Sequence, residues 1–209
     1  MSLMLPDGYV ENLDPAVYLD APQAVEWQPD VLPIAADLAR IAGSSTIVDL
    51  GCGAARKLIP LASEFDVIGV DLPAIVDALP DVPGATWIGH DLTAKALPAA
   101  AVVAGSVVVC SDVLEHIVDV TRLRTRFRQV LRGGAECIVI STPDRDCYYG
   151  PDHLGPPRNP THVREWTLAE LVDLMQSWGF TVTDAGHTRS NDGSPNEWTS
   201  LVIITAGES

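Results

Sequence analysis

Residues 48–53, with the sequence Val-Asp-Leu-Gly-Cys-Gly, end a short apolar run and open a glycine-rich turn. The run Thr46–Leu50 has the length and the β-branched content of a buried strand. Gly51 and Gly53 carry no side chain, so the backbone of the turn can approach a ligand closely. A helix after the turn would direct unpaired N–H groups to the same place, which favours a carboxylate or a phosphate. The motif therefore predicts a site for a nucleotide-like cofactor.

The next three apolar runs each end beside an acidic residue. The runs are Val67–Asp71, Thr86–His90 and Val107–Ser111, and the acids are Asp71, Asp91 and Asp112. An acid at the end of the second strand can accept hydrogen bonds from ribose hydroxyls, and open α/β sheets bind ligands at this edge. No basic residue that would suit a ribose phosphate follows Asp71.

The order of these motifs resembles the class I S-adenosylmethionine-dependent methyltransferases, from about Asp49 to the C-terminus. The resemblance extends to Leu131-Arg132-Gly133-Gly134, which is similar to the family's turn before its fifth strand. It implies S-adenosylmethionine as the cofactor, bound by residues at the ends of the first four strands. These residues are Asp49, Gly51, Cys52, Gly53, Asp71, Leu72, Asp91, Leu92, Ser111, Asp112 and Val113.

Two features bear on this resemblance. Many family members have a third glycine in the first loop, where this chain has Ala54 and Ala55. A nicotinamide-dependent oxidoreductase is the nearest alternative, but its fingerprint requires a glycine at the sixth position for close helix–strand packing. That position is Arg56 here, so the oxidoreductase is the less favoured interpretation.

The pattern of elements predicts the fold class. A helix from about Pro29 to Ala42, ended by Gly43, precedes strands and helices that alternate up to Thr142, which indicates parallel strands with right-handed crossovers. Two later runs, Phe180–Thr183 and Trp198–Thr205, match the C-terminal hairpin of the family. We therefore expect an α/β, Rossmann-like, doubly wound, mostly parallel seven-stranded sheet with an antiparallel C-terminal hairpin.

Length and composition predict one methyltransferase-like domain over residues 1–209, because 47% hydrophobic residues suffice for a substantial core. Its expected parts are an N-terminal lid and helix (1–42), a cofactor-binding core (43–142), an acceptor-side loop (143–167), and a C-terminal helix and hairpin (168–209). The sequence contains no run of 18 apolar residues, so no membrane span is predicted. We expect a cytoplasmic protein, because residues 1–8 lack a secretion signal and the four cysteines have no C-x-x-C spacing.

Charge predicts the class of partner. The net charge of −15 repels polyphosphate, so we expect no nucleic acid partner. Five arginines lie on the helix before the fifth strand, where the spacing of apolar residues indicates a solvated outer face. Asp152, His153 and His162 have no recognisable metal-ligand spacing, so no metal is expected.

The acceptor-side loop, from Pro143 to Trp166, has no helical or strand pattern, and loops of this length are often functional. It leaves the ligand edge of the sheet, so we expect it to bind the acceptor. Its end has a structural interpretation, since Thr167 and Glu170 form a capping box and Trp166 fits a packing role. The oligomeric state is not predicted.

Three histidines are candidate catalytic bases: His116, His153 and His162. Histidine suits proton removal from a hydroxyl near pH 7, whereas a carboxylate or neutral amine acceptor needs no base. For His116, simple packing of its segment over the cofactor is an equal alternative.

The predicted function is S-adenosylmethionine-dependent methyl transfer to a small-molecule acceptor. The acceptor-side loop resembles that of bacterial small-molecule methyltransferases, some seen beside glycan-building enzymes, which implies a sugar or glycan precursor. A cofactor-binding but non-catalytic sensor or partner subunit stays open, because no residue is unambiguously catalytic.

Overall fold

The computed structural model describes Tyr9, residues 26–148, Gly150, residues 152–191, Gly193 and residues 197–207. Most of the expected N-terminal lid, including Tyr18, lies outside the described residues. No helix in the described part of the chain has both the length and the apolar character needed to cross a membrane.

Seven strands form a single sheet in the order β3-β2-β1-β4-β5-β7-β6. Strands β1 to β5 pair in parallel, and β7 pairs antiparallel with both β5 and β6. The expected mostly parallel sheet with an antiparallel hairpin is thus confirmed. The strands are β1 (Thr46–Leu50), β2 (Asp66–Asp71), β3 (Ala85–Gly89), β4 (Val107–Ser111), β5 (Cys137–Pro143), β6 (Phe180–Arg189) and β7 (Trp198–Ala206).

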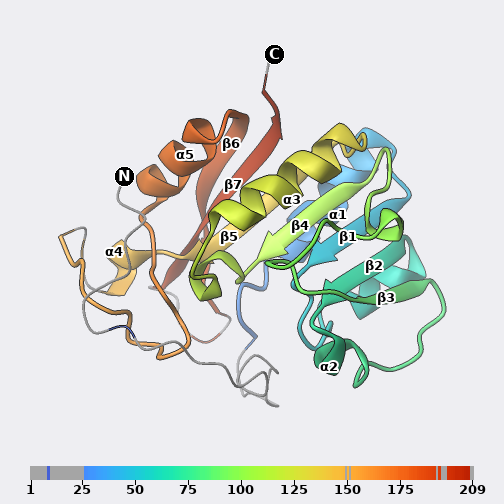
Figure 1. The fold of residues 1–209 in the computed structure, drawn as a ribbon, viewed down its shortest axis with the longest axis horizontal. Helices are drawn as coiled ribbons and strands as arrows, with labels where there is room; N and C mark the ends of the chain where they lie inside the picture. Colours follow the sequence, from blue (N-terminus) through green and yellow to red (C-terminus); the bar gives the residue numbers. More distant parts are fainter. Residues whose placement is uncertain are drawn as a thin grey trace.

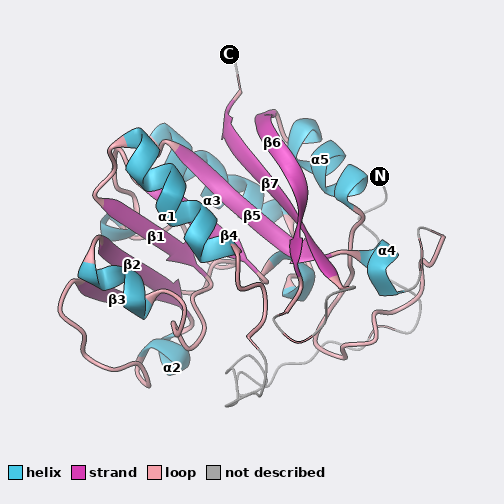
Figure 2. Ribbon diagram, turned by 180° about the vertical axis from the view of Figure 1, so that it is seen from behind, coloured by secondary structure: helices cyan, strands magenta, loops and turns pink. Residues whose placement is uncertain are grey.

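Helices cover both faces of the sheet (Figure 1). Helices α3 and α5 lie on one face, and Figure 2 shows α1 across the opposite face. Each face has its own apolar core: Phe127 and Leu171 are buried on the first, and Ala35 on the second. The helices are α1 (Val31–Ala42), α2 (Pro73–Val76), α3 (Thr121–Arg132), α4 (Arg145–Tyr148) and α5 (Leu168–Ser177), with short 3-10 turns η2 (Ile59–Ser63), η3 (Ala99–Ala101) and η4 (Leu114–His116).

The chain after β1 differs from the sequence prediction. No α-helix follows the glycine turn; residues 51–58 form successive turns, and the 3-10 helix η2 comes after them. Ala55 has a φ of 54°, a left-handed conformation that interrupts a right-handed helix. The predicted helix N-terminus at this place is therefore wrong.

The chain after β5 is also more ordered than its sequence indicates. Helix α4 forms one turn directly after β5, and Asp144 pairs with Trp166 in an isolated parallel bridge. Trp166 is only 3% exposed, which confirms its packing role. The capping box of Thr167 and Glu170 is present at the start of α5, as predicted.

Candidate active site

The sheet has a topological switch point between β1 and β4, which lead to β2 and β5 on opposite sides. Asp49 on β1 pairs in register with Gly69 of β2 and Val109 of β4. In open α/β sheets the crevice at the carboxyl ends of the strands beside such a point is the usual place for a ligand. The cofactor residues expected from sequence all lie on strands β1 to β4 or just beyond their ends.

The glycine loop packs against the segment after β4. Gly51 has a φ of 89°, and its N–H donates to the carbonyl of Val70 at 2.7 Å. A Cβ at Gly51 would lie 2.3 Å from Cγ2 of Val113. Position 51 therefore requires glycine for both its conformation and its close approach. Cys52 is buried, and its Sγ lies against Gly69 of β2.

The carboxylate of Asp71 holds the glycine loop. It accepts the N–H of Gly53 at 2.8 Å and the N–H of Leu72 at 2.7 Å, one on each oxygen. Burial raises the pKa of Asp71, while these two hydrogen bonds oppose the rise. Each carboxylate oxygen has a second lone-pair direction, so the group retains capacity to accept hydroxyl donors.

Asp49 is a buried acid with an oxygen that lacks a hydrogen-bond donor among the described residues. It is 6% exposed, and its Oδ1 has no hydrogen-bond donor among them. Burial raises the pKa of Asp49 to about 7, and the positive charge of Lys57 opposes this rise. A ligand that brings a positive charge to the glycine loop would stabilise the ionised carboxylate. The site is therefore suited to a cationic group.

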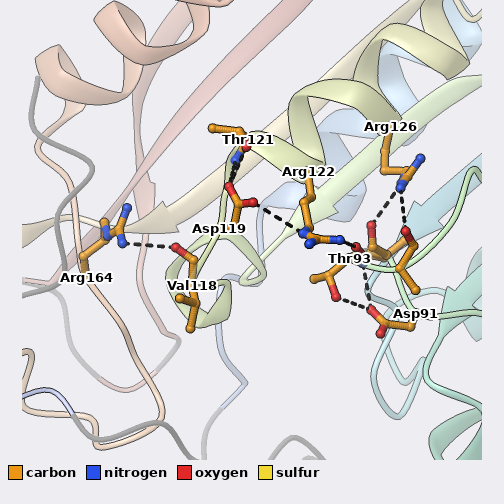
Figure 3. A network of polar contacts seen from close by, with 10 residues as sticks. Asp91, Thr93, Val118, Asp119, Thr121, Arg122, Arg126 and Arg164 are labelled. Atoms are coloured by element: carbon orange, nitrogen blue, oxygen red, sulfur yellow. Dashed lines mark hydrogen bonds and ion pairs between the residues drawn. The ribbon is translucent and has the colours of Figure 1, made fainter.

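Arginines of α3 hold the loop after β3, as Figure 3 shows. Arg126 donates from Nε to the carbonyl of Leu92 at 3.0 Å, and Arg122 donates to the carbonyl of Thr93 at 2.6 Å. Asp91 in turn accepts the N–H and the hydroxyl of Thr93, both at 2.7 Å. Arg126 is only 6% exposed. The prediction of a wholly solvated arginine face was wrong at this position.

Gln28 lies at the carboxyl ends of β4 and β5 and was not predicted from sequence. Its Oε1 accepts the hydroxyls of Ser111 at 3.0 Å and Ser141 at 2.6 Å, and its Nε2 donates to Asp112 at 2.7 Å. The side chain is 2% exposed. A segment preceding α1 thereby fixes the end of β4.

Two carboxyl groups follow β4, the first half-buried and the second fully buried. Asp112 has a φ of 60°, and Glu115 on η4 is fully buried. Burial and the neighbouring Asp112 raise the pKa of Glu115 well above its ordinary value. Burial also acts to raise the pKa of Asp112, but the neighbouring carboxyl of Glu115 and the charges of His116 and His162 outweigh it and lower that pKa.

The structure brings two of the three candidate histidines together. The rings of His116 and His162 meet edge to face, with centroids 4.8 Å apart. Nδ1 of His116 lies 3.1 Å from the carbonyl of Thr161, and Nδ1 of His162 lies 2.8 Å from Oε1 of Glu165. Burial lowers the pKa of His116, which favours its neutral form.

The third histidine contacts its own loop. The ring of His153 lies over Gly155, and its Nε2 is 3.5 Å from the carbonyl of Pro156. Its role stays a prediction. Tyr149, another residue of the expected acceptor-side loop, lies outside the described residues.

The described residues contain a group with the spacing of metal ligands. One ligand atom from each of Glu115, His116 and His162 lies within 4.8 Å of the other two. The sequence did not predict this set, because His162 lies on the acceptor-side loop, far along the chain from Glu115 and His116.

A family model described as a methyltransferase domain matches residues 23–185. The chain belongs to this methyltransferase family. A protein of Mycolicibacterium smegmatis, described as a probable S-adenosylmethionine-dependent methyltransferase, is 30% identical over 151 residues. The match covers 70% of this chain and 56% of the relative, so the methyltransferase domain described here spans just over half the relative's length.

Solved structures of methyltransferases share the fold. The glycopeptide N-methyltransferase MtfA, complexed with sinefungin, matches with a TM-score of 0.63 and 17% identity, over 96% of this chain and all of that one. The small RNA methyltransferase HEN1 matches with a TM-score of 0.60 and 20% identity, over 91% of this chain and 27% of that one. These likenesses establish the architecture of the methyltransferase domain.

Proposed function

We propose that this methyltransferase domain binds S-adenosylmethionine at the carboxyl ends of β1, β2 and β4 and transfers its methyl group to a small-molecule acceptor. The cofactor supplies a methyl group already activated on a sulfonium. Family membership supports the proposal. The observation that carries it is the buried, undersatisfied carboxyl of Asp49 beside a glycine loop whose backbone can approach a ligand.

The chain offers groups that suit each part of the cofactor. Asp49 would face a cationic group, since its Oδ1 lacks a donor among the described residues. Asp71 would accept ribose hydroxyls, because it already closes the loop and has lone pairs to spare. Asp91 and Leu92 would flank the adenine, on a loop that arginines of α3 hold in place.

Positioning is the main contribution that the protein makes. An aligned acceptor can lower the barrier by roughly 7–11 kcal/mol relative to reactants free in solution. For a hydroxyl acceptor, His116 and His162 are the histidines best placed to remove a proton, because they meet at the end of β4. His153 remains a candidate on the loop that we expect to cover the acceptor.

The acceptor proposed is a small metabolite with hydroxyl groups, such as a sugar or glycan precursor. The net charge of −15 supports a small acceptor over a polyanion, because an acidic surface repels phosphates. One structural neighbour is the small RNA methyltransferase HEN1, so RNA belongs in the test as a competing acceptor.

Thermal unfolding with S-adenosylmethionine, S-adenosylhomocysteine and NAD tests the cofactor. A ligand at 100 times its dissociation constant adds about 2.7 kcal/mol to stability. We expect both adenosyl compounds to raise the melting temperature and NAD to leave it unchanged. No shift with either adenosyl compound at millimolar concentration would contradict the proposal.

Transfer of a labelled methyl group to pooled sugars, other small metabolites and small RNA tests the reaction. Incorporation into the small molecules supports the proposed acceptor class, whereas incorporation into RNA alone would overturn it. Cofactor binding with no transfer to any acceptor would favour the non-catalytic sensor.

A further inference from the structure

We propose that Glu115, His116 and His162 form a binding site for a first-row divalent metal ion, with Asp112 beside it. The ligand atoms of the three residues lie within 4.8 Å of one another, a spacing that a bound cation can bridge. Two imidazoles and a carboxylate on one side of an ion leave positions for other ligands, as in the facial arrangement of many iron sites.

The carboxyl group of Glu115 provides the strongest evidence. The residue is fully buried, and neither Oε1 nor Oε2 has a hydrogen-bond partner among the described residues. No lysine or arginine within the described ranges forms an ion pair with Glu115 or with Asp112. A buried acid is costly unless it is paired, protonated or bound to a metal. A cation would satisfy both oxygens and offset the adjacent charge of Asp112.

The two histidines have the supporting contacts of metal ligands. A histidine that binds a metal through one ring nitrogen usually donates the other N–H to a carboxylate or a backbone carbonyl. His162 directs Nδ1 at the carboxylate of Glu165, and His116 directs Nδ1 at the carbonyl of Thr161. If both Nδ1 atoms carry the proton, the lone pair of each ring is on Nε2.

The amide of Asn159 also contacts His162, with Nδ2 2.9 Å from Nε2. Because His162 Nε2 is an acceptor in this arrangement, the same contact supports the tautomer that a metal requires. A bound ion would displace this amide from Nε2. Asn159 lies on an exposed stretch of the acceptor-side loop, so its side chain has room to move aside.

The mixture of ligands selects the class of metal. Imidazole suits zinc, iron, copper and nickel, whereas carboxylate also suits manganese and magnesium. A set with two imidazoles favours a first-row ion such as Mn²⁺ or Zn²⁺ over Mg²⁺, which prefers oxygen ligands and retains its waters.

The location of the site suggests what the ion would contact. Glu115 and His116 follow β4, where the proposed cofactor site lies, and His162 belongs to the loop proposed to cover the acceptor. An ion here would bind an oxygen of the acceptor and favour its deprotonated form. This role rests on the proposed function, whereas metal binding itself does not. The proposal departs from the sequence expectation of no metal.

The experiment measures metal binding directly, without cofactor or acceptor. The full chain is treated with a chelator, exchanged into metal-free buffer and titrated with Mn²⁺, while electron paramagnetic resonance counts the free ion. Competition with Zn²⁺ and Mg²⁺ follows. We expect one Mn²⁺ per chain, displaced by Zn²⁺ and only weakly by Mg²⁺.

Three variants identify the ligands. Glu115→Gln keeps the shape of the side chain and removes its charge, and His162→Phe keeps a ring but removes both imidazole nitrogens; we expect loss of binding in both. Glu165→Gln replaces the charged acceptor of His162 Nδ1 by a neutral amide, and it should weaken Mn²⁺ binding about 10- to 100-fold, as a change in a supporting residue does. His187→Gln is the matched control, because His187 also contacts a carboxylate, that of Asp144, outside the cluster.

The outcomes separate this proposal from the proposed function. Wild-type protein that binds no Mn²⁺ or Zn²⁺, or a Glu115→Gln protein that binds them as wild type does, overturns the metal site. In that case Glu115 is a protonated carboxyl beside Asp112. S-Adenosylmethionine binding, measured with chelator present, then still decides the proposed function independently. Near-ultraviolet circular dichroism checks that each variant is folded.

Discussion

The side-chain amide of Gln28 donates a hydrogen bond to Oδ1 of Asp112 at 2.7 Å and joins a segment before α1 to the end of β4. The same amide accepts hydroxyls from Ser111 and Ser141, on two neighbouring strands. Gln28, which lies outside the sheet, thus joins the carboxyl ends of β4 and β5 through its side chain. The stability and the binding competence of this edge should therefore depend on Gln28.

Gln28→Ala should destabilise the fold. The change leaves the buried hydroxyl of Ser111 without its acceptor, whereas the hydroxyl of Ser141 can still donate to Ser111 Oγ. An unsatisfied buried group costs about 1–3 kcal/mol. Urea denaturation should show a lower midpoint with an unchanged m-value. Gln176→Ala, on an exposed position of α5, is the control and should unfold as wild type does. Equal stability of the two variants would contradict the role assigned to Gln28.

Gly51→Ala should abolish cofactor binding. The new Cβ would lie 2.3 Å from Cγ2 of Val113, so the loop or the segment after β4 must move. Gly105→Ala is the matched control, because Gly105 also has a positive φ of 73° but has nothing within 4 Å of the added Cβ. Adding Val113→Ala to Gly51→Ala removes the clashing atom and should restore part of the binding. Calorimetry with S-adenosylmethionine measures all three.

Asp49 should make the stability of the ligand-free protein depend on pH. Its pKa is about 7 in the folded protein, against an ordinary value of 3.8, so the folded state binds the proton more tightly. Stability from this source is fully present below about pH 4 and is lost as pH rises through about 7. The difference amounts to about 4 kcal/mol at most, from 1.36 kcal/mol per pKa unit.

The comparison of wild type with Asp49→Asn isolates this effect. Denaturant melts from pH 4 to pH 8 should show the free energy of unfolding falling less in the variant than in wild type. Asp66→Asn, at the exposed start of β2, should follow wild type. A parallel decline in all three proteins would show that Asp49 is not the group responsible.

Arg126→Met should weaken cofactor binding through the loop after β3. The variant keeps the apolar stem but loses the hydrogen bond from the charged guanidinium to the carbonyl of Leu92. Hydrogen bonds of charged groups contribute about 1.5–3 kcal/mol to stability. We expect weaker S-adenosylmethionine binding by titration. Arg132→Met, an exposed position on the same helix, provides the control. Unchanged affinity in Arg126→Met would mean that the loop is held by other contacts.

Local sequence signals predicted the sheet and the glycine loop well. The run Thr46–Leu50 and its following glycines form a strand and a turn as expected, because apolar content and glycine act within a few residues. The helix expected after them is absent, since Ala55 adopts a left-handed conformation that a small residue does not reveal in sequence. Strand β6 continues to Arg189, past the apolar run, because it pairs with β7 as far as Arg189, with one register shift between Val182 and Asp184.

Contacts between segments that are remote along the chain could not be predicted from the sequence. Gln28 follows a stretch without periodicity, and its partners lie 83 to 113 positions away. The spacing of apolar residues on α3 placed Arg126 toward solvent, but a loop 34 positions earlier covers it. His116 and His162 were each proposed from sequence, yet their meeting and the burial of Glu115 depend on how the acceptor-side loop folds back over η4.

The central claim is that the carboxyl edge of β1 and β2 binds S-adenosylmethionine, and titration calorimetry with two variants of β2 tests it most directly. Asp71→Asn changes the acid at the ligand end of the strand, and Asp66→Asn changes the exposed acid at its other end. We predict that wild type and Asp66→Asn bind S-adenosylmethionine with equal affinity and that Asp71→Asn binds at least about ten-fold more weakly, a loss of 1.4 kcal/mol or more. Wild-type affinity in Asp71→Asn, or no binding by wild type, would contradict the account.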